Sequence, residues 1–489
     1  MGALKKLAQQ TAVYGVSSIL QRFITFLIFP YISRVASPTE YGVYVELLTY
    51  TALLNIILTY GLETGFFRFA NQFNPDKVFS TSLMSIIATS ISFFSLFFIF
   101  RHNIAESLDY NEYLSYLFLV VIVIILDAFL AIPYAKLRFQ EKALRFSMIK
   151  LLNVVVMVSF TMFFISGCPF LIEKWGWRFL EVIYNPDFLV GYVLLAYVVA
   201  SFISLLLLIP EIFSVKFNFD FSIWKKLMLF SLPILVSQLA GFLPDSVDKL
   251  MLKHLDTSGD PLVQLGDYGA NLKFASMVII AVQMFRYAAE PFFFAAAKNS
   301  NAKLVYADII KYVSIFGVLI FVGISFNMPI LKYIVGADFR DSLNVVDIVI
   351  FGYVMYALFY SLSAWYKVSD NTHLAIIFTG VGALVTIVGN YFIIPLFGYT
   401  GSAWIRVLTY SVMVLLSYGF SLHYYKMPIQ LLRIAMYFSI GLFLVFIASN
   451  LSFDSVVKEL LLKNSIIIMF VLFIAWNENI LQMVKKRFQ

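Results

Sequence analysis

Long apolar runs recur along the whole chain, and each is close to the length that crosses a bilayer. Windows of about 19 residues, the length used to detect transmembrane helices, separate fourteen such runs by short polar turns. The pattern predicts an all-α polytopic membrane protein with about 14 transmembrane helices. The predicted spans lie near 11–33, 41–65, 79–100, 114–135, 147–166, 188–210, 227–250, 267–290, 309–326, 343–366, 373–396, 400–422, 431–450 and 464–482.

The first apolar run carries a polar stripe that includes a charge. Thr11, Tyr14, Ser18, Arg22 and Thr25 follow one another at spacings of three and four, which places them on one helix face. An arginine at this depth costs roughly 2.5–3.5 kcal/mol on insertion scales, and usually faces a protein interior or a water-filled cavity. Arg22 is therefore the first candidate for a cavity cation. The alternative is an arginine that holds helices together by pairing with an acid.

Composition and charge also indicate a membrane protein. Hydrophobic residues make up 61% of the 489 residues and charged residues 13%, compared with about 45–50% and about 25% in soluble domains. The net charge of +7 is explained by Lys and Arg gathered in the loops on the side of both termini, so we expect cytoplasmic termini and no nucleic acid partner. The single cysteine, Cys168, excludes an intramolecular disulfide.

Two internal echoes suggest a repeat. Residues 39–55 (TEYGVYVELLTYTALLN) resemble 266–280 (GDYGANLKFASMVII), and 141–153 resemble 370–382 more weakly. A repeat with an even number of spans keeps its orientation, which predicts two parallel six-helix lobes with a cavity between them. The expected domains are an N-terminal lobe at 1–212, a C-terminal lobe at 213–426 and an appended helix pair at 427–489.

Four segments in this order, 29–50, 60–70, 137–146 and 390–410, resemble the polysaccharide-type exporters of the multidrug/oligosaccharidyl-lipid/polysaccharide (MOP) superfamily. The resemblance covers about 1–425. It implies a V-shaped, MATE-like transporter that alternates between inward and outward openings in the bacterial inner membrane. The implied cargo is an undecaprenyl-diphosphate-linked oligosaccharide, such as an O-antigen unit, moved to the periplasmic leaflet for polysaccharide biosynthesis. Multidrug antiporters share the superfamily, so the fold alone leaves the cargo open.

A lipid-linked diphosphate requires a hydrated basic cavity, and the planar fork of arginine can bind two phosphate oxygens. The predicted substrate-binding cations are Arg22, Lys249, Lys273, Arg286 and Arg406, with Ser18, Thr25, Gln238 and Gln283 as polar cavity residues. Two alternatives remain open. Lys249 lies between Asp245 and Lys253 at spacings of four, as in a solvated ion-pair ladder, and Arg286 could pair with Glu290.

Three buried acids and one basic segment are further candidates for a functional role. Glu46, Glu63 and Asp127 could bind a coupling cation, H+ or Na+, or could neutralise Arg22 and the other cations, which we favour. The amphipathic segment 136–145 predicts a cytoplasmic surface helix that touches anionic headgroups; a docking site for polysaccharide synthesis proteins is the alternative.

Motifs for catalysis, metal binding and cofactors are absent from the sequence. The four histidines are scattered, and there is no P-loop, nucleophile elbow or dinucleotide fingerprint. We therefore expect no enzyme, no metal and no cofactor. The alternatives to a flippase are an ion-coupled multidrug antiporter of the same fold and a membrane-embedded sugar polymerase or glycosyltransferase. The intramembrane Arg and Lys favour an anionic cargo over a cationic drug, and the short loops disfavour the enzyme.

Overall fold

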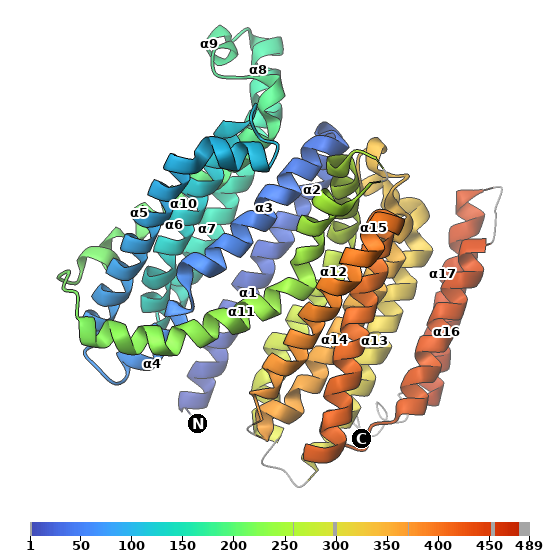
Figure 1. The fold of residues 1–489 in the computed structure, drawn as a ribbon. Helices are drawn as coiled ribbons and strands as arrows, with labels where there is room; N and C mark the ends of the chain where they lie inside the picture. Colours follow the sequence, from blue (N-terminus) through green and yellow to red (C-terminus); the bar gives the residue numbers. More distant parts are fainter. Residues whose placement is uncertain (1, 258, 297–300, 370, 451–454, 479–489) are drawn as a thin grey trace. The chain divides into compact units, whose positions relative to one another are not determined.

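The structure is a computed structural model that describes residues 2–257, 259–296, 301–369, 371–450 and 455–478; side chains at 2–12, 14, 285–296 and 449 lie outside this description. Regular structure among the described residues is helical throughout (Figure 1). The helices are α1 (Gly2–Leu27), α2 (Phe29–Val35), α3 (Pro38–Thr59), α4 (Leu62–Ala70), α5 (Pro75–Ser107), α6 (Leu114–Phe139), α7 (Ala143–Met162), α8 (Cys168–Trp175), α9 (Arg178–Glu181), α10 (Leu189–Phe213), α11 (Phe221–Leu255), α12 (Pro261–Ala296), α13 (Ala302–Leu331), α14 (Val346–Val368), α15 (Leu374–Tyr424), α16 (Leu431–Asn450) and α17 (Val456–Asn477).

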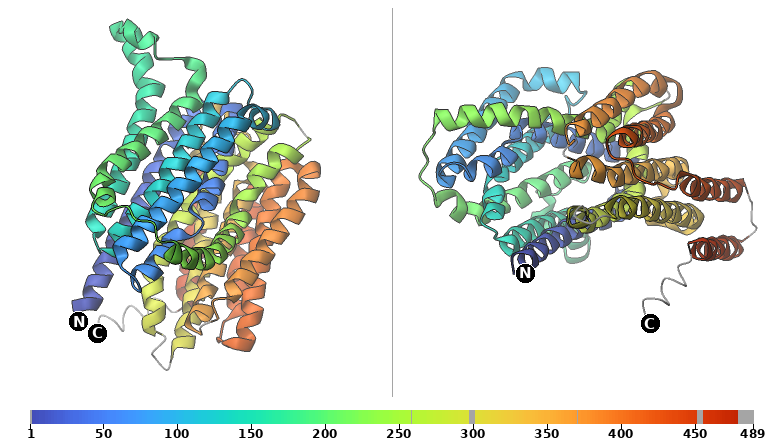
Figure 2. Two further views of the ribbon diagram at one scale, coloured as in Figure 1. Left: turned by 60° about the vertical axis from the view of Figure 1, so that its left-hand side comes forward. Right: turned by 90° about the horizontal axis from the view of Figure 1, so that it is seen from below.

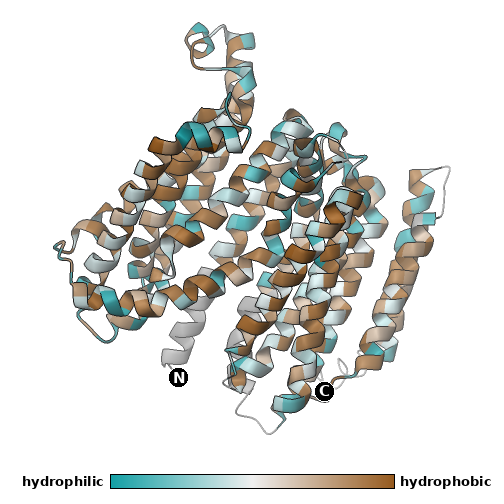
Figure 3. Ribbon diagram, viewed as in Figure 1, coloured by the Kyte–Doolittle hydropathy of each residue, from teal (hydrophilic) through white to brown (hydrophobic). Residues whose placement is uncertain are grey.

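Membrane-length helices account for most of the chain. Twelve segments of the described residues are long and apolar enough to cross a membrane, and apolar residues follow them over most of their length (Figure 3). One of these segments is α15, where Gly398 has φ 53° and ψ −141° and divides the helix into two arms. Counting both arms, and adding the 36-residue α12, gives fourteen helices. The prediction of an all-α polytopic protein with about 14 spans is confirmed.

Local signals set the helix ends in the first part of the chain. Ser37 forms a capping box with Glu40: the Ser37 hydroxyl accepts from the Glu40 N–H at 3.3 Å, and the Glu40 carboxylate accepts from the Ser37 N–H at 2.8 Å. Pro38 follows at the first helical position, where its missing N–H costs nothing. These contacts confirm the predicted turn between the first two spans. The left-handed Tyr60 and Gly61 then separate α3 from α4.

The chain forms two compact units, which we call unit 1 (1–269 with 394–396) and unit 2 (270–393 with 397–489). Within unit 1, α6 packs against α3, α5 and α10, α7 packs against α1 and α10, and α11 lies along α3, α4 and α5 (Figure 2). Within unit 2, α13 is central and contacts α14, α16 and α17. The division into lobes that we inferred from the internal repeat stays a prediction.

The N-terminal turns of α3 and α12, both in unit 1, cross with their backbones in contact. A Cβ atom at Gly42 would overlap the carbonyl oxygen of Leu262, and one at Gly266 would overlap the carbonyl oxygen of Pro38. Only glycine permits so close an approach. The two crossing segments carry the Tyr-Gly sequence of the predicted repeat, so the echo in the sequence corresponds to two helix starts that touch.

A buried ion pair fixes the last helices in unit 2. Glu478 directly follows α17, and its carboxylate lies 2.7 Å from Nζ of Lys311 on α13. The Tyr437 hydroxyl on α16 donates to the same carboxylate at 2.7 Å. Lys311 and Glu478 are both buried, so α16 and α17 are attached to α13 by charge as well as by apolar packing.

Candidate functional site

Glu46, in the middle of α3, accepts hydrogen bonds from side chains in two other parts of unit 1. Nζ of Lys253, near the end of α11, lies 3.1 Å from the carboxylate, and the Tyr110 hydroxyl donates to it at 2.7 Å. Lys253 also donates to the Leu108 carbonyl at 2.6 Å. Glu46 is 0% exposed, so its charge is neutralised in place by Lys253. This pair joins α3, α11 and the turn between α5 and α6.

Asp127 on α6 belongs to a second polar cluster in unit 1. The Ser201 hydroxyl on α10 donates to its carboxylate at 2.6 Å. Lys150 on α7 is the cation that interacts with Asp127 electrostatically, without a direct ion pair among the described residues. Nζ of Lys150 lies instead 4.1 Å from the ring centre of Tyr134. The cluster therefore places an acid, a hydroxyl and a cation on three neighbouring helices.

Glu63 forms a direct ion pair with Arg138 near the end of α6. Both side chains are partly exposed. The prediction of a surface helix at 136–145 is wrong, because α6 continues to Phe139 and α7 begins at Ala143 after a turn of three residues. Arg145, at the start of α7, pairs with Glu211 at 2.9 Å.

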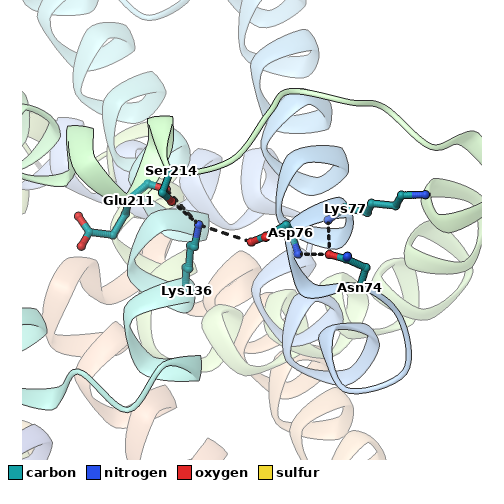
Figure 4. Close-up of polar contacts among 6 residues, drawn as sticks. All are labelled: Asn74, Asp76, Lys77, Lys136, Glu211 and Ser214. Atoms are coloured by element: carbon teal, nitrogen blue, oxygen red, sulfur yellow. Dashed lines mark hydrogen bonds and ion pairs between the residues drawn. The ribbon is translucent and has the colours of Figure 1, made fainter.

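Lys136 anchors the same end of unit 1 (Figure 4). It is buried and donates to the Glu211 carbonyl at 3.2 Å and to the Ser214 hydroxyl at 2.8 Å. Its Nζ also lies 4.0 Å from the carboxylate of Asp76, in the first turn of α5. Asn74 caps that turn by accepting from the Asp76 N–H at 2.9 Å. The cation thus ties the ends of α6 and α10 to the start of α5.

The predicted cavity residues of α1 lie along one part of that helix. The Arg22 side chain is exposed, whereas Ser18 and Thr25 are half-buried. The Thr25 hydroxyl donates to the Gln21 carbonyl of its own helix at 2.8 Å. Arg22 is thus accessible in this conformation, unlike Lys253 or Lys136.

The predicted cations of α11 differ in their surroundings. Nζ of Lys249 donates to the Asp245 carbonyl at 3.0 Å, and the side chain is half-buried. Gln238 is exposed. Lys253, the third residue of the predicted ladder, does not continue it. Lys253 forms the buried pair with Glu46 instead.

Unit 2 holds the remaining predicted cations. Lys273 and Gln283 on α12 are half-buried, and the side chain of Arg286 lies outside the described residues. Arg406, on the second arm of α15, is 1% exposed. Its guanidinium donates to the Tyr353 hydroxyl of α14 at 3.2 Å. Arg406 is therefore enclosed by protein in this conformation.

Unit 2 also repeats the acid–hydroxyl contact of unit 1. Asp347 on α14 accepts from the Ser325 hydroxyl on α13 at 2.6 Å, as Asp127 accepts from Ser201. Lys463 on α17 interacts with Asp347 electrostatically. Among the described residues, no group of three His, Cys, Asp or Glu side chains could hold a metal ion.

Two cations of these clusters carried too weak a signal in the sequence to be chosen as site residues. Lys150 stands at the start of an apolar run and resembles a span boundary, but α7 begins two turns earlier. Lys253 stands near the end of a run and resembles a solvated residue.

The fold is that of known membrane transporters. A structure of the lipid II flippase MurJ in an inward closed conformation aligns with 96% of this chain and 99% of its own, with TM-score 0.75 and 15% identity. A MATE family multidrug resistance transporter of the MOP superfamily, inward-facing, aligns with 86% of this chain and 96% of its own, with TM-score 0.65 and 14% identity. These likenesses confirm the expected fold class.

Sequence comparison defines the family. The family model described as "Polysaccharide biosynthesis protein" matches residues 7–295, more than half of the chain, so the protein belongs to this family. It is also similar to Lsg locus putative protein 1 of Haemophilus influenzae, with 24% identity over 314 residues, which are 63% of this chain and 70% of that protein. The resemblance to polysaccharide-type MOP exporters is thereby confirmed.

Proposed function

We propose that the protein is a flippase that moves undecaprenyl-diphosphate-linked oligosaccharide units from the cytoplasmic to the periplasmic leaflet by alternating access. The family match over 7–295 carries this proposal, because it connects the chain to polysaccharide biosynthesis. The structural likeness to a lipid II flippase supports a lipid-linked cargo. We place the protein in the bacterial inner membrane with both termini cytoplasmic, as the distribution of Lys and Arg indicates. We infer transport and not catalysis as its activity.

The proposed cargo contacts are cations that suit a diphosphate. Arg22 is the first of these, because it is exposed on α1 and its guanidinium can bind two phosphate oxygens. Lys249 and Lys273, both half-buried, are further candidates. Arg406 would have to leave its contact with Tyr353 to reach the cargo, so we assign it a weaker direct contribution.

The experiment is export of glycan by a strain that lacks the native gene. The chain, expressed in that strain, is expected to restore surface glycan and to clear the lipid-linked unit from the cytoplasmic face. A reconstituted assay gives the direct test: purified protein in vesicles should expose a fluorescent lipid-linked oligosaccharide to a membrane-impermeant glycosidase. No gain in accessibility over protein-free vesicles would contradict the proposal.

An ion-coupled multidrug antiporter is the second candidate, because the chain also shares its fold with MATE transporters. It predicts that expression raises the tolerated concentration of cationic dyes in a drug-sensitive strain. Surface glycan that stays absent while dye tolerance rises would favour this candidate over the flippase.

A further inference from the structure

Two cations at one end of unit 1 lie against the faces of phenylalanine rings. Cζ of Arg68, on the last turn of α4, is 4.3 Å from the ring centre of Phe230 and 5.8 Å from that of Phe69. Nζ of Lys226, on the second turn of α11, is 4.5 Å from the ring centre of Phe73. Phe69 contacts both other rings, with centroids 6.1 Å from Phe73 and 5.8 Å from Phe230. We call these five residues the cation–phenylalanine cluster.

The two positive charges of this cluster lie at the protein surface. Arg68 and Lys226 are both exposed, and neither has a carboxylate within 4.0 Å among the residues that the structure describes. Three cations at this end of unit 1 behave differently: Lys136, Arg138 and Arg145 each lie within that distance of an acid. A cation that lies on one face of a ring still has N–H groups that point away from that ring and can bind a ligand. The cluster therefore presents two positive charges outward.

The adjoining chain indicates that the cluster lies at the bilayer surface. The linker before α11 has no regular secondary structure, and its Asn218 and Asp220 N–H groups donate to Ser80 and Thr81 of α5 at 2.6 and 3.2 Å. Three aromatic side chains beside these contacts are exposed: Phe217 and Phe219 of the linker are 46% and 41% exposed, and Phe221, the first residue of α11, is 66% exposed. Exposed rings next to cations are typical of the membrane–water interface.

We propose that the cation–phenylalanine cluster binds the phosphate headgroup of a lipid. The guanidinium of Arg68 supplies the planar fork for two phosphate oxygens, and Lys226 supplies a second charge across the rings. The acyl or prenyl chain of that lipid lies beside the exposed Phe217, Phe219 and Phe221. The headgroup belongs either to a lipid-linked diphosphate or to an anionic phospholipid. The assignment of this end to the cytoplasmic leaflet rests on the proposed function.

The test measures lipid binding by the purified full chain in neutral detergent micelles, with undecaprenyl diphosphate and phosphatidylglycerol as separate probes. The variants are Arg68→Gln, Lys226→Gln and the double substitution. Lys174→Gln is the matched control, because Lys174 is also exposed and lies 5.0 Å from a single phenylalanine ring, on α8. Each lost charge is expected to weaken binding about fivefold, and the effect should shrink as salt rises.

The two probes distinguish the sources of the headgroup. Weaker binding of undecaprenyl diphosphate alone identifies a cargo site, and weaker binding of both lipids identifies a general phosphate-lipid site; either result supports the proposal. Unchanged binding of both lipids, or an equal loss in the Lys174 control, overturns it. Because binding is measured without transport, a chain that binds these lipids but fails the vesicle assay would contradict the flippase and leave the site standing. Unchanged thermal unfolding of the variants verifies that they fold.

Discussion

Lys253→Met is expected to destabilise unit 1 severely. In the native structure the ammonium of Lys253 lies 3.1 Å from a carboxylate that is 0% exposed, that of Glu46. Without the lysine, the hydroxyl of Tyr110 at 2.7 Å is the one donor left to that carboxylate among the residues that the structure describes. Removing one partner of a buried ion pair costs about 3–5 kcal/mol, because the other charge remains buried and unpaired. Glu46→Gln should cost less, since Lys253 keeps the Leu108 carbonyl at 2.6 Å.

The double variant Glu46→Gln/Lys253→Met tests this reasoning. It removes both charges, and a glutamine can still accept from Tyr110, so it should be more stable than Lys253→Met alone. Replacing a buried pair by neutral residues is often close to neutral in stability, and we expect a coupling energy of about 2–3 kcal/mol between the two sites.

Cys168 provides the assay. It is the single cysteine of the chain and is buried in unit 1, so a maleimide dye reacts with it when this unit unfolds. Thermal scans in micelles rank the variants, and titration with a denaturing detergent gives the free energies. Equal stability of wild type and Lys253→Met would refute the buried pair. A double variant whose loss equals the sum of the two single losses would show that the charges do not interact.

The remaining predictions concern single positions. Gly42→Ala should cost about 1–3 kcal/mol in the same unfolding assay, because the new methyl group overlaps a backbone carbonyl of α12, whereas Gly241→Ala, with open space around it, should cost nothing. Arg22→Ala should abolish surface glycan at matched expression and Arg22→Lys should retain part of it; wild-type glycan from the alanine variant would remove this residue from the site. Lys142→Cys in a cysteine-free background should resist an impermeant thiol reagent added to intact cells, and labelling would contradict cytoplasmic termini. Asp127→Asn should abolish transport at unchanged protein level, and full transport would exclude it as an essential coupling acid.

The membrane spans could be predicted because their signal is local. A run of apolar residues has the same length and composition in the sequence as in the fold, and the Ser37-Pro38 turn carries its own capping chemistry. The break at Gly398 could be found in the same way, because polar and small residues interrupt two apolar runs there.

The turn after α6 could not be predicted, because its sequence lacks a turn signal. Residues 136–145 keep a helical period across the break, since the end of α6 and the start of α7 both contribute to it. Glu141 adopts a left-handed φ of 57° in this turn, where glycine or asparagine would have marked it. Three cations of the segment meet acids on other elements of unit 1, so the predicted basic face does not form.

The partners of the buried charges could not be predicted, because they lie far apart in the sequence. Glu46 and Lys253 are 207 positions apart, and they meet because α3 packs against α11. No local pattern specifies which of several buried acids meets which cation. The sequence therefore indicated that the acids neutralise Arg22 and the other cations, but it did not indicate which cation each acid meets; the structure pairs Glu46 with Lys253 and Glu63 with Arg138.

The surroundings of the three acids separate them as candidates for a coupling ion. Such an acid has to exchange its ion in each cycle, and Glu46 would first have to break a buried pair at 3.1 Å, at a cost of about 3–5 kcal/mol. Glu63 is partly exposed and already paired with Arg138. Asp127 accepts from a neutral hydroxyl and has its cation at a distance, so it can take up a proton or Na+ without breaking an ion pair. Since Asp347 repeats this arrangement in unit 2, Asp347→Asn alone should show whether the second site also supports transport; full transport by this variant would leave Asp127 as the coupling candidate.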